Sequence, residues 1–132
     1  MKKAKTYGLT HIAIAVKDLD QTLAFYQKVF EVKVMYHKDD FLQVTTPGAN
    51  DLIVFEKKKA DPDSYRDGKT GGIAHFGFRL RDARDIDEMA KRIKSAGGTI
   101  IDKGEFVPGE PYIFFKDPDG YEVEICYELI EE

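Results

Sequence analysis

Two histidines and two glutamates stand at matching places in the two halves of the sequence. His11 and His75 lie 64 residues apart within similar segments, and Glu56 and Glu124 lie 68 residues apart within two others. The difference between the two spacings fits a longer loop at 104–109. Two imidazoles and two carboxylates are a ligand set for a divalent metal ion. The sequence therefore predicts a metal site built from His11, Glu56, His75 and Glu124.

The residues beside each histidine are small. Both histidines belong to segments that alternate like half-buried strands, so His11 shares its strand face with Ala13 and Ala15, and His75 shares its face with Gly77. Small neighbours leave space that a packed core strand would fill. A single histidine of this kind is compatible with a structural role, but recurrence in both halves favours a ligand cavity.

Two further features each leave two interpretations open. Arg79 lies on the predicted face of His75, where it is either a surface or dimer-contact residue or a clamp for an anionic group of a substrate. The clamp is chemically reasonable because a guanidinium can bind a carboxylate through two parallel hydrogen bonds. Tyr112, Phe114 and Phe115 are compatible either with the wall of a substrate pocket or with the core.

An internal repeat carries these residues. The segment 8–14 resembles the segment 72–78 at the same offset of 64, and each copy runs into a helical pattern that opens with acidic residues. Three strand-like runs follow each helix. They are 32–37, 41–46 and 52–57 in the first half, and 99–103, 111–116 and 121–127 in the second. The predicted organisation is β-α-β-β-β twice.

The two copies should form one α+β domain over residues 1–132. We expect paired βαβββ modules at about 7–58 and 71–128, connected by residues 57–70, which are rich in Lys, Asp, Pro and Gly. A module of this kind leaves sheet edges and one sheet face uncovered. The two modules should therefore pair into an eight-stranded open barrel or cup.

Composition excludes several classes of protein. A content of 42% hydrophobic and 33% charged residues is typical of a globular chain, not a disordered one. The net charge of −4 gives no broad cationic surface for nucleic acid, and no apolar run is long enough to cross a membrane. The single cysteine, Cys126, cannot form an intrachain disulfide, and no signal sequence opens the chain, so a cytoplasmic location is expected.

Three segments resemble the vicinal-oxygen-chelate superfamily, which contains glyoxalases, bleomycin-resistance proteins and dioxygenases. The segment 8–20 followed by Phe25-Tyr26 resembles its opening strand and helix, the segment 72–78 its second-module strand, and the segment 115–124 its terminal Asp-Pro-Asp-Gly-x-x-x-Glu signature. The resemblance implies a paired βαβββ fold and a homodimer. It also implies a divalent ion (Zn, Ni, Co, Mn or Fe) that binds adjacent oxygens of a small-molecule substrate.

Within the superfamily, the resemblance is to glyoxalase I. Such members use two His and two Glu, and Glu56 lies 19 residues before His75 much as in bacterial glyoxalases. The resemblance implies an isomerase or lyase in which Glu56 or Glu124 moves a proton between adjacent carbons. Ala15 stands where glutathione-using glyoxalases tend to carry Arg, so glutathione is not implied as the thiol.

Two alternatives remain open. Extradiol dioxygenases and fosfomycin-modifying enzymes of the superfamily use three ligands, which correspond here to His11, His75 and Glu124, and such a set leaves room for substrate and O₂. A metal-free drug-binding resistance protein is the second alternative. It would not need these three residues together.

Overall fold

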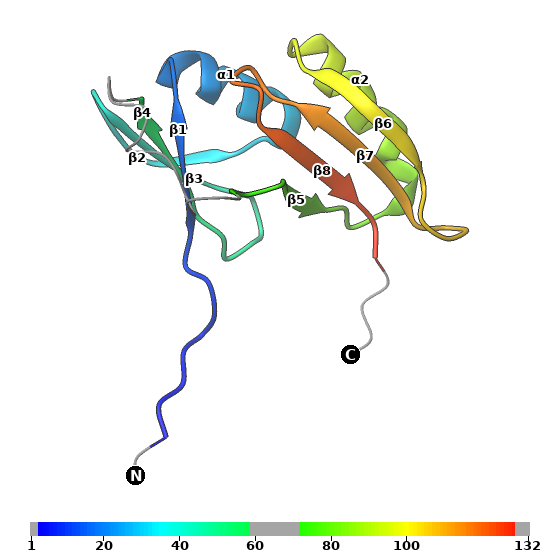
Figure 1. The fold of residues 1–132 in the computed structure, drawn as a ribbon, viewed down its shortest axis with the longest axis horizontal. Coiled ribbons are helices and arrows are strands. Elements are labelled where there is room, and N and C mark those ends of the chain that lie inside the picture. Colours follow the sequence, from blue (N-terminus) through cyan, green and yellow to red (C-terminus); the bar gives the residue numbers. More distant parts are fainter. Residues whose placement is uncertain (1–2, 59–71, 129–132) are drawn as a thin grey trace.

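The computed structural model describes residues 3–58 and 72–128, and within them eight strands and two α-helices (Figure 1). Residues 59–71, which include most of the predicted connection, lie outside the described residues. The first module contains β1 (Ile12–Val16), α1 (Leu19–Phe30), β2 (Lys33–Lys38), β3 (Phe41–Thr45) and β4 (Ile53–Lys57). The second contains β5 (Phe76–Arg79), a short 3-10 turn (Ala83–Asp85), α2 (Ile86–Ser95), β6 (Thr99–Glu105), β7 (Pro111–Lys116) and β8 (Glu122–Cys126).

The strands form two four-stranded sheets with the same topology. Their orders are β1-β4-β3-β2 and β5-β8-β7-β6. In each sheet one neighbouring pair is parallel, β1 with β4 and β5 with β8, and the other neighbouring pairs are antiparallel. The predicted fold class of two βαβββ modules is confirmed. The eight strands are divided between two mixed sheets and, within the described residues, no strand pair joins one sheet to the other.

Local signals in the sequence fix the ends of the helices. The Asp18 carboxylate accepts a hydrogen bond of 3.0 Å from the N–H of Gln21, which satisfies a free donor in the first turn of α1. Gly97 follows α2 with a φ of +93°, a left-handed conformation that glycine adopts without steric cost. None of the helices among the described residues is long and apolar enough to cross a membrane.

The two modules share one hydrophobic core, which is built on β1, β3 and β4 of the first sheet and on β5, β7 and β8 of the second, whereas the side chains of β2 are exposed. Ile14 and Val16 of β1 and Ile113 and Phe115 of β7 are buried in it. Phe115 is therefore a core residue and not part of a substrate wall, whereas Tyr112 and Phe114 alternate with it and lie on the opposite face. Helix α1 also contacts the second sheet, because the ring of Phe30 stacks on Phe78 at 3.8 Å between centroids.

The turn between β7 and β8 fastens the second module to the first. The Tyr26 hydroxyl on α1 donates to Asp117 Oδ2 at 2.8 Å, and both side chains are buried. The other carboxylate oxygen of Asp117 accepts from the backbone N–H groups of Asp119 and Tyr121. Burial raises the pKa of both the Tyr26 hydroxyl and the Asp117 carboxyl. The hydrogen bonds therefore offset a real desolvation cost.

Further hydrogen bonds reach the first module from the same turn. Asp119 Oδ1 accepts from the backbone N–H of Lys17 at 2.9 Å, and the Tyr121 hydroxyl donates to the carbonyl of Ala15 at 2.7 Å. The Ala15 carbonyl belongs to β1, and the Lys17 N–H lies directly after its end. The Asp-Pro-Asp-Gly signature thus sets the position of the first strand relative to the second module.

Removing the Asp117 carboxylate should destabilise the protein strongly. Asp117→Ala leaves the Tyr26 hydroxyl and two backbone N–H groups without their acceptor, so we expect a loss of about 3 kcal/mol, against about 1–2 kcal/mol for Tyr26→Phe. Urea unfolding followed by circular dichroism measures both. Asp39→Ala, on an exposed turn, is the matched control and should change stability by less than about 0.5 kcal/mol. An Asp117→Ala loss no larger than that of the control would contradict the assignment.

Candidate metal centre

The second sheet presents an open face that carries most of the predicted site. Along β5 and the residue before it, the alternation places His75, Gly77 and Arg79 on the open face, while Phe76 and Phe78 pack against the core. On β8, Glu122, Glu124 and Cys126 share the open face, since Val123 and Ile125 are fully buried. Two adjacent strands therefore bring imidazole and carboxylate groups together.

His75 and Glu124 form the centre of this face. Nε2 of His75 lies 3.5 Å from Oε1 of Glu124, and the side chains are 39% and 15% exposed. Gly77 lies directly opposite Glu124 in the strand register, and a Cβ at Gly77 would come within 3.2 Å of the Glu124 carbonyl oxygen. The glycine thus provides the space in which the Glu124 side chain reaches toward His75, as the small-residue pattern predicts.

Glu122 is a second carboxylate beside His75. Its Oε2 lies 3.9 Å from Nδ1 of His75, on the side of the ring away from Glu124. Histidines that bind metal ions commonly donate their other ring N–H to a carboxylate, which fixes the tautomer and the ring orientation. Glu122 is not among the ligands predicted from the sequence. Its position two residues before Glu124 on an alternating strand was the available signal.

His11 lies on the open side of the first module. It immediately precedes β1, is exposed, and its Nδ1 is 2.5 Å from the Thr10 hydroxyl. It lines a cavity of about 470 Å³ together with Gly77 and Arg79, but neither His75 nor Glu124 is among the described residues of that lining. Thr46 lines the same cavity, and its buried hydroxyl has no hydrogen-bond partner among the described residues.

The structure does not bring the four predicted ligands together within one chain. Among the described residues, no group of three or more His, Cys, Asp or Glu side chains is arranged to hold a metal ion. The pair of His75 and Glu124 is formed, and His11 lies apart from it. The site as one chain presents it is therefore incomplete.

Glu56 is not the structural counterpart of Glu124. Glu124 pairs with Gly77, two residues after His75, whereas Glu56 pairs with Ala15, four residues after His11. The residue of the first module that matches Glu124 is Val54, opposite Ala13. The alignment at an offset of 68 is therefore displaced by two residues at this strand. The turn between the last two strands also differs in length, since it spans 46–52 in the first module and only 117–121 in the second.

Arg79 and Cys126 complete the open face. Nη2 of Arg79 lies 3.8 Å from Oε2 of Glu128, and the arginine side chain is 53% exposed, so it is available to a bound anion. The thiol of Cys126 contacts the same Glu128. Burial, with Glu124 and Glu128 nearby, raises the pKa of Cys126 to about 11, which keeps it protonated at neutral pH.

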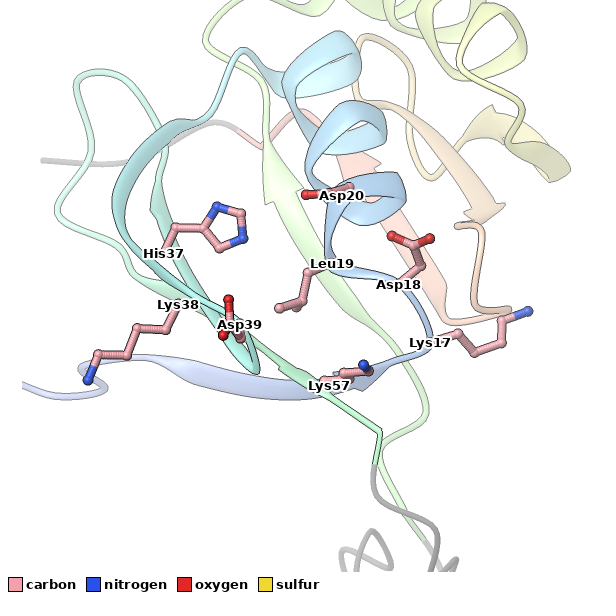
Figure 2. A pocket seen from close by; sticks show the side chains of 8 residues that line it. All are labelled: Lys17, Asp18, Leu19, Asp20, His37, Lys38, Asp39 and Lys57. Carbon is pink, nitrogen blue, oxygen red and sulfur yellow. The ribbon is translucent and has the colours of Figure 1, made fainter.

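A second cavity of about 480 Å³ lies at the other end of the first module (Figure 2). His37 points into it from β2 toward α1, while Lys17 and Lys38 point outward. Three lysines and three aspartates line it, so their formal charges balance. None of the predicted ligands is among the described residues that line this cavity.

Comparisons with known proteins agree with the resemblance seen in the sequence. The family model of the glyoxalase/bleomycin resistance protein/dioxygenase superfamily matches residues 8–125. The fosfomycin resistance protein FosX of Listeria monocytogenes is 29% identical over 95% of this chain and 92% of its own length. A lactoylglutathione lyase of Neisseria meningitidis is 30% identical over 88% of this chain and 87% of its own length.

Solved structures of FosX from Listeria monocytogenes have the same fold. A complex with Mn(II) and sulfate superimposes with a TM-score of 0.75 and 25% identity, covering 96% of this chain and 94% of that one. A variant with Mn(II) and 1S,2S-dihydroxypropylphosphonic acid gives a TM-score of 0.72 at 25% identity, covering 92% and 90%. With the family model spanning nearly all of the described strands and helices, the chain belongs to the glyoxalase/bleomycin resistance protein/dioxygenase superfamily.

Proposed function

We propose that this chain is a metal-dependent enzyme that acts on a small substrate through two adjacent oxygens of that substrate. The observation that carries the proposal is the pair of His75 and Glu124 on an open sheet face, with Gly77 leaving the space between them. One imidazole nitrogen and one carboxylate oxygen suit Mn, Fe, Co, Ni or Zn. A bound ion would polarise a substrate oxygen as a Lewis acid.

His11 is the third ligand in this proposal and comes from a second copy of the chain. Within one chain His75 and Glu124 lack a third partner among the described residues, and the open faces of both modules are accessible. Residues 3–10 extend away from both sheets and carry the exposed side chains of Tyr7 and Leu9 (Figure 1). A symmetric homodimer would use the same contacts twice and complete two equivalent sites.

The strand register supports three protein ligands in place of four. Because Val54, not Glu56, occupies the place that matches Glu124, the first module offers a histidine without a paired carboxylate. Glu56 remains a candidate base or fourth ligand only if it reaches the site from two residues further along β4. FosX of Listeria monocytogenes has been solved in complex with Mn(II), which supports a metal ion in this chain as well.

The first candidate reaction is isomerase or lyase chemistry of the glyoxalase type, which moves a proton between adjacent carbons without O₂. The two carboxylates beside His75 favour it, since such chemistry needs a base close to the chelated oxygens. Anaerobic turnover of a thiohemiacetal of a 2-oxoaldehyde would support this reaction. Consumption of O₂ in the presence of a catechol and Fe(II) would contradict this reaction and support the dioxygenase alternative.

The second candidate reaction is ring opening of a small epoxide such as fosfomycin by water, in which the water oxygen bonds to an epoxide carbon as its carbon–oxygen bond breaks, and the proton lost by the water is balanced by protonation of the released oxygen. A site with three protein ligands, as the strand register supports, and the similarity to FosX favour this reaction. Product formation from fosfomycin in the presence of Mn(II), followed by ³¹P NMR, tests it directly. A phosphonate signal that stays unchanged with the metal-loaded protein would exclude this candidate.

Metal binding should require all three ligands. We expect about one Mn(II) per chain by isothermal titration calorimetry, and loss of stoichiometric binding in His75→Ala, because each ligand supplies a directed bond as well as charge complementarity. His37→Ala removes a histidine outside the site and should bind Mn(II) as the wild type does. Unchanged stoichiometry in a double variant lacking His11 and His75 would refute the assignment.

Glu122 should tune the affinity for the ion without binding it. Glu122→Gln removes the charge of the acceptor facing Nδ1 of His75, and we expect Mn(II) affinity to fall about 10- to 100-fold with the stoichiometry retained. Glu110→Gln, a carboxylate on the β6–β7 connection, serves as the control. Equal affinities for the two variants would show that Glu122 does not orient His75.

Arg79 should matter for anionic substrates only. Arg79→Ala should lower kcat/KM for an acid substrate about 10- to 100-fold, because it removes a charge-assisted contact of about 1.5–3 kcal/mol, while metal content stays the same. A neutral ester of the same substrate and the variant Arg84→Ala, an arginine that is 89% exposed and paired with Asp82, are the controls. If Arg79→Ala and Arg79→Lys both keep the wild-type kcat/KM for the acid, Arg79 does not bind the anionic group and its role is structural.

A further inference from the structure

Three aromatic side chains extend from the candidate metal centre to the tip of the β6–β7 hairpin. The ring of Phe114 meets His75 edge-on at 5.2 Å between centroids, and Tyr112 meets Phe114 at 5.6 Å. Phe106 then stacks on Tyr112 at 4.2 Å with an interplanar angle of 19°. We call Phe106, Tyr112 and Phe114 the aromatic platform.

Tyr112 is held in place by its surroundings. It pairs with Gly104 of β6, where a Cβ would lie 3.0 Å from its hydroxyl oxygen, so only glycine lets the ring lie across this strand. Its hydroxyl donates to Asp102 Oδ2 at 3.0 Å. That hydrogen bond raises the pKa of Tyr112, which keeps the hydroxyl protonated and the ring neutral. A fixed aromatic ring costs little conformational entropy when it binds a ligand.

The platform is accessible and continuous with the ligand pair. Phe114 lies opposite Glu124, and Tyr112 lies opposite Cys126, which itself pairs with Arg79. Phe106 is 58% exposed, and the neighbouring Val107 is 50% exposed. Large apolar side chains gathered on one face beside polar ligands are typical of a small-molecule site in which a few polar groups orient an apolar body.

We propose that the aromatic platform binds a flat apolar group, an aryl ring or a conjugated carbon system, that is attached directly beside the two metal-chelating oxygens of the substrate. The proposal rests on the proposed function and narrows its substrate class. Stacking geometry selects flat groups, because offset or edge-on contacts with Phe106 and Tyr112 favour a planar partner over an alkyl chain. An aliphatic substrate such as methylglyoxal or fosfomycin would leave the platform in contact with water.

A matched pair of chelators tests the platform independently of turnover. Acetohydroxamate and benzohydroxamate present the same two adjacent oxygens, and they differ in a methyl against a phenyl group. Their affinities for the Mn(II)-loaded protein are measured by calorimetry. The ratio of the two affinities is then divided by the same ratio measured for free Mn(II). We expect the protein to prefer benzohydroxamate by about tenfold after this correction.

Variants assign the preference to the platform. Tyr112→Ala should abolish the preference and leave the affinity for acetohydroxamate within about twofold, whereas Tyr112→Phe keeps the ring and should retain it. Phe106→Ala, at the exposed hairpin tip, provides a second variant in case Tyr112→Ala does not fold. Tyr36→Ala changes an exposed tyrosine on β2 and is the control.

The outcomes separate this proposal from the one on which it rests. If neither hydroxamate binds the metal-loaded protein, the proposed metal-dependent function fails and the platform proposal fails with it. Equal corrected affinities for the two hydroxamates would overturn the platform alone. A Tyr112→Ala variant that keeps the preference but dissociates in analytical ultracentrifugation would also overturn it, because the platform would then be a contact between copies of the chain.

Discussion

The arrangement depends on a single constraint: one face of β5, β7 and β8 is buried in a core that both modules share, so polar side chains of these strands lie on the opposite face. Because side chains alternate along β5 and β8, and Val123 and Ile125 lie in the core, the side chains of His75, Glu122 and Glu124 lie on the open face. The polar groups stay near water and near one another, and burial of their apolar neighbours holds them there.

The Asp-Pro-Asp-Gly turn holds the two modules in a defined position relative to each other. Asp117 accepts three hydrogen bonds, one of them from Tyr26 of the other module, and Asp119 and Tyr121 fasten the end of β1. A sequence signature that resembles a functional motif thus has a structural task of its own, since it sets how the strand that follows His11 lies against the second module.

The sequence predicts the elements well and the site in part. Helical spacing and acidic starts place both helices, and period-two alternation places His75, Glu124 and Gly77 on one face, because these are local properties of the chain. The alignment of Glu56 with Glu124 is wrong by two residues, since the spacing of the repeat does not determine which residues pair across neighbouring strands. Glu122 has no matching carboxylate in the first half of the repeat. The separation of His11 from His75 depends on how the two sheets pack, which periodicity does not encode.

The claim that two copies share each metal site is tested most directly by mixing two inactive variants. His11→Ala and Glu124→Ala should each bind no Mn(II) stoichiometrically when alone. If the site is shared, mixed dimers contain one intact site that joins Glu124 of one chain to His11 of the partner subunit, and random exchange restores about one ion per four chains. If all ligands come from one chain, every site keeps a defect and the mixture binds no more Mn(II) than the separate variants, which would contradict the account.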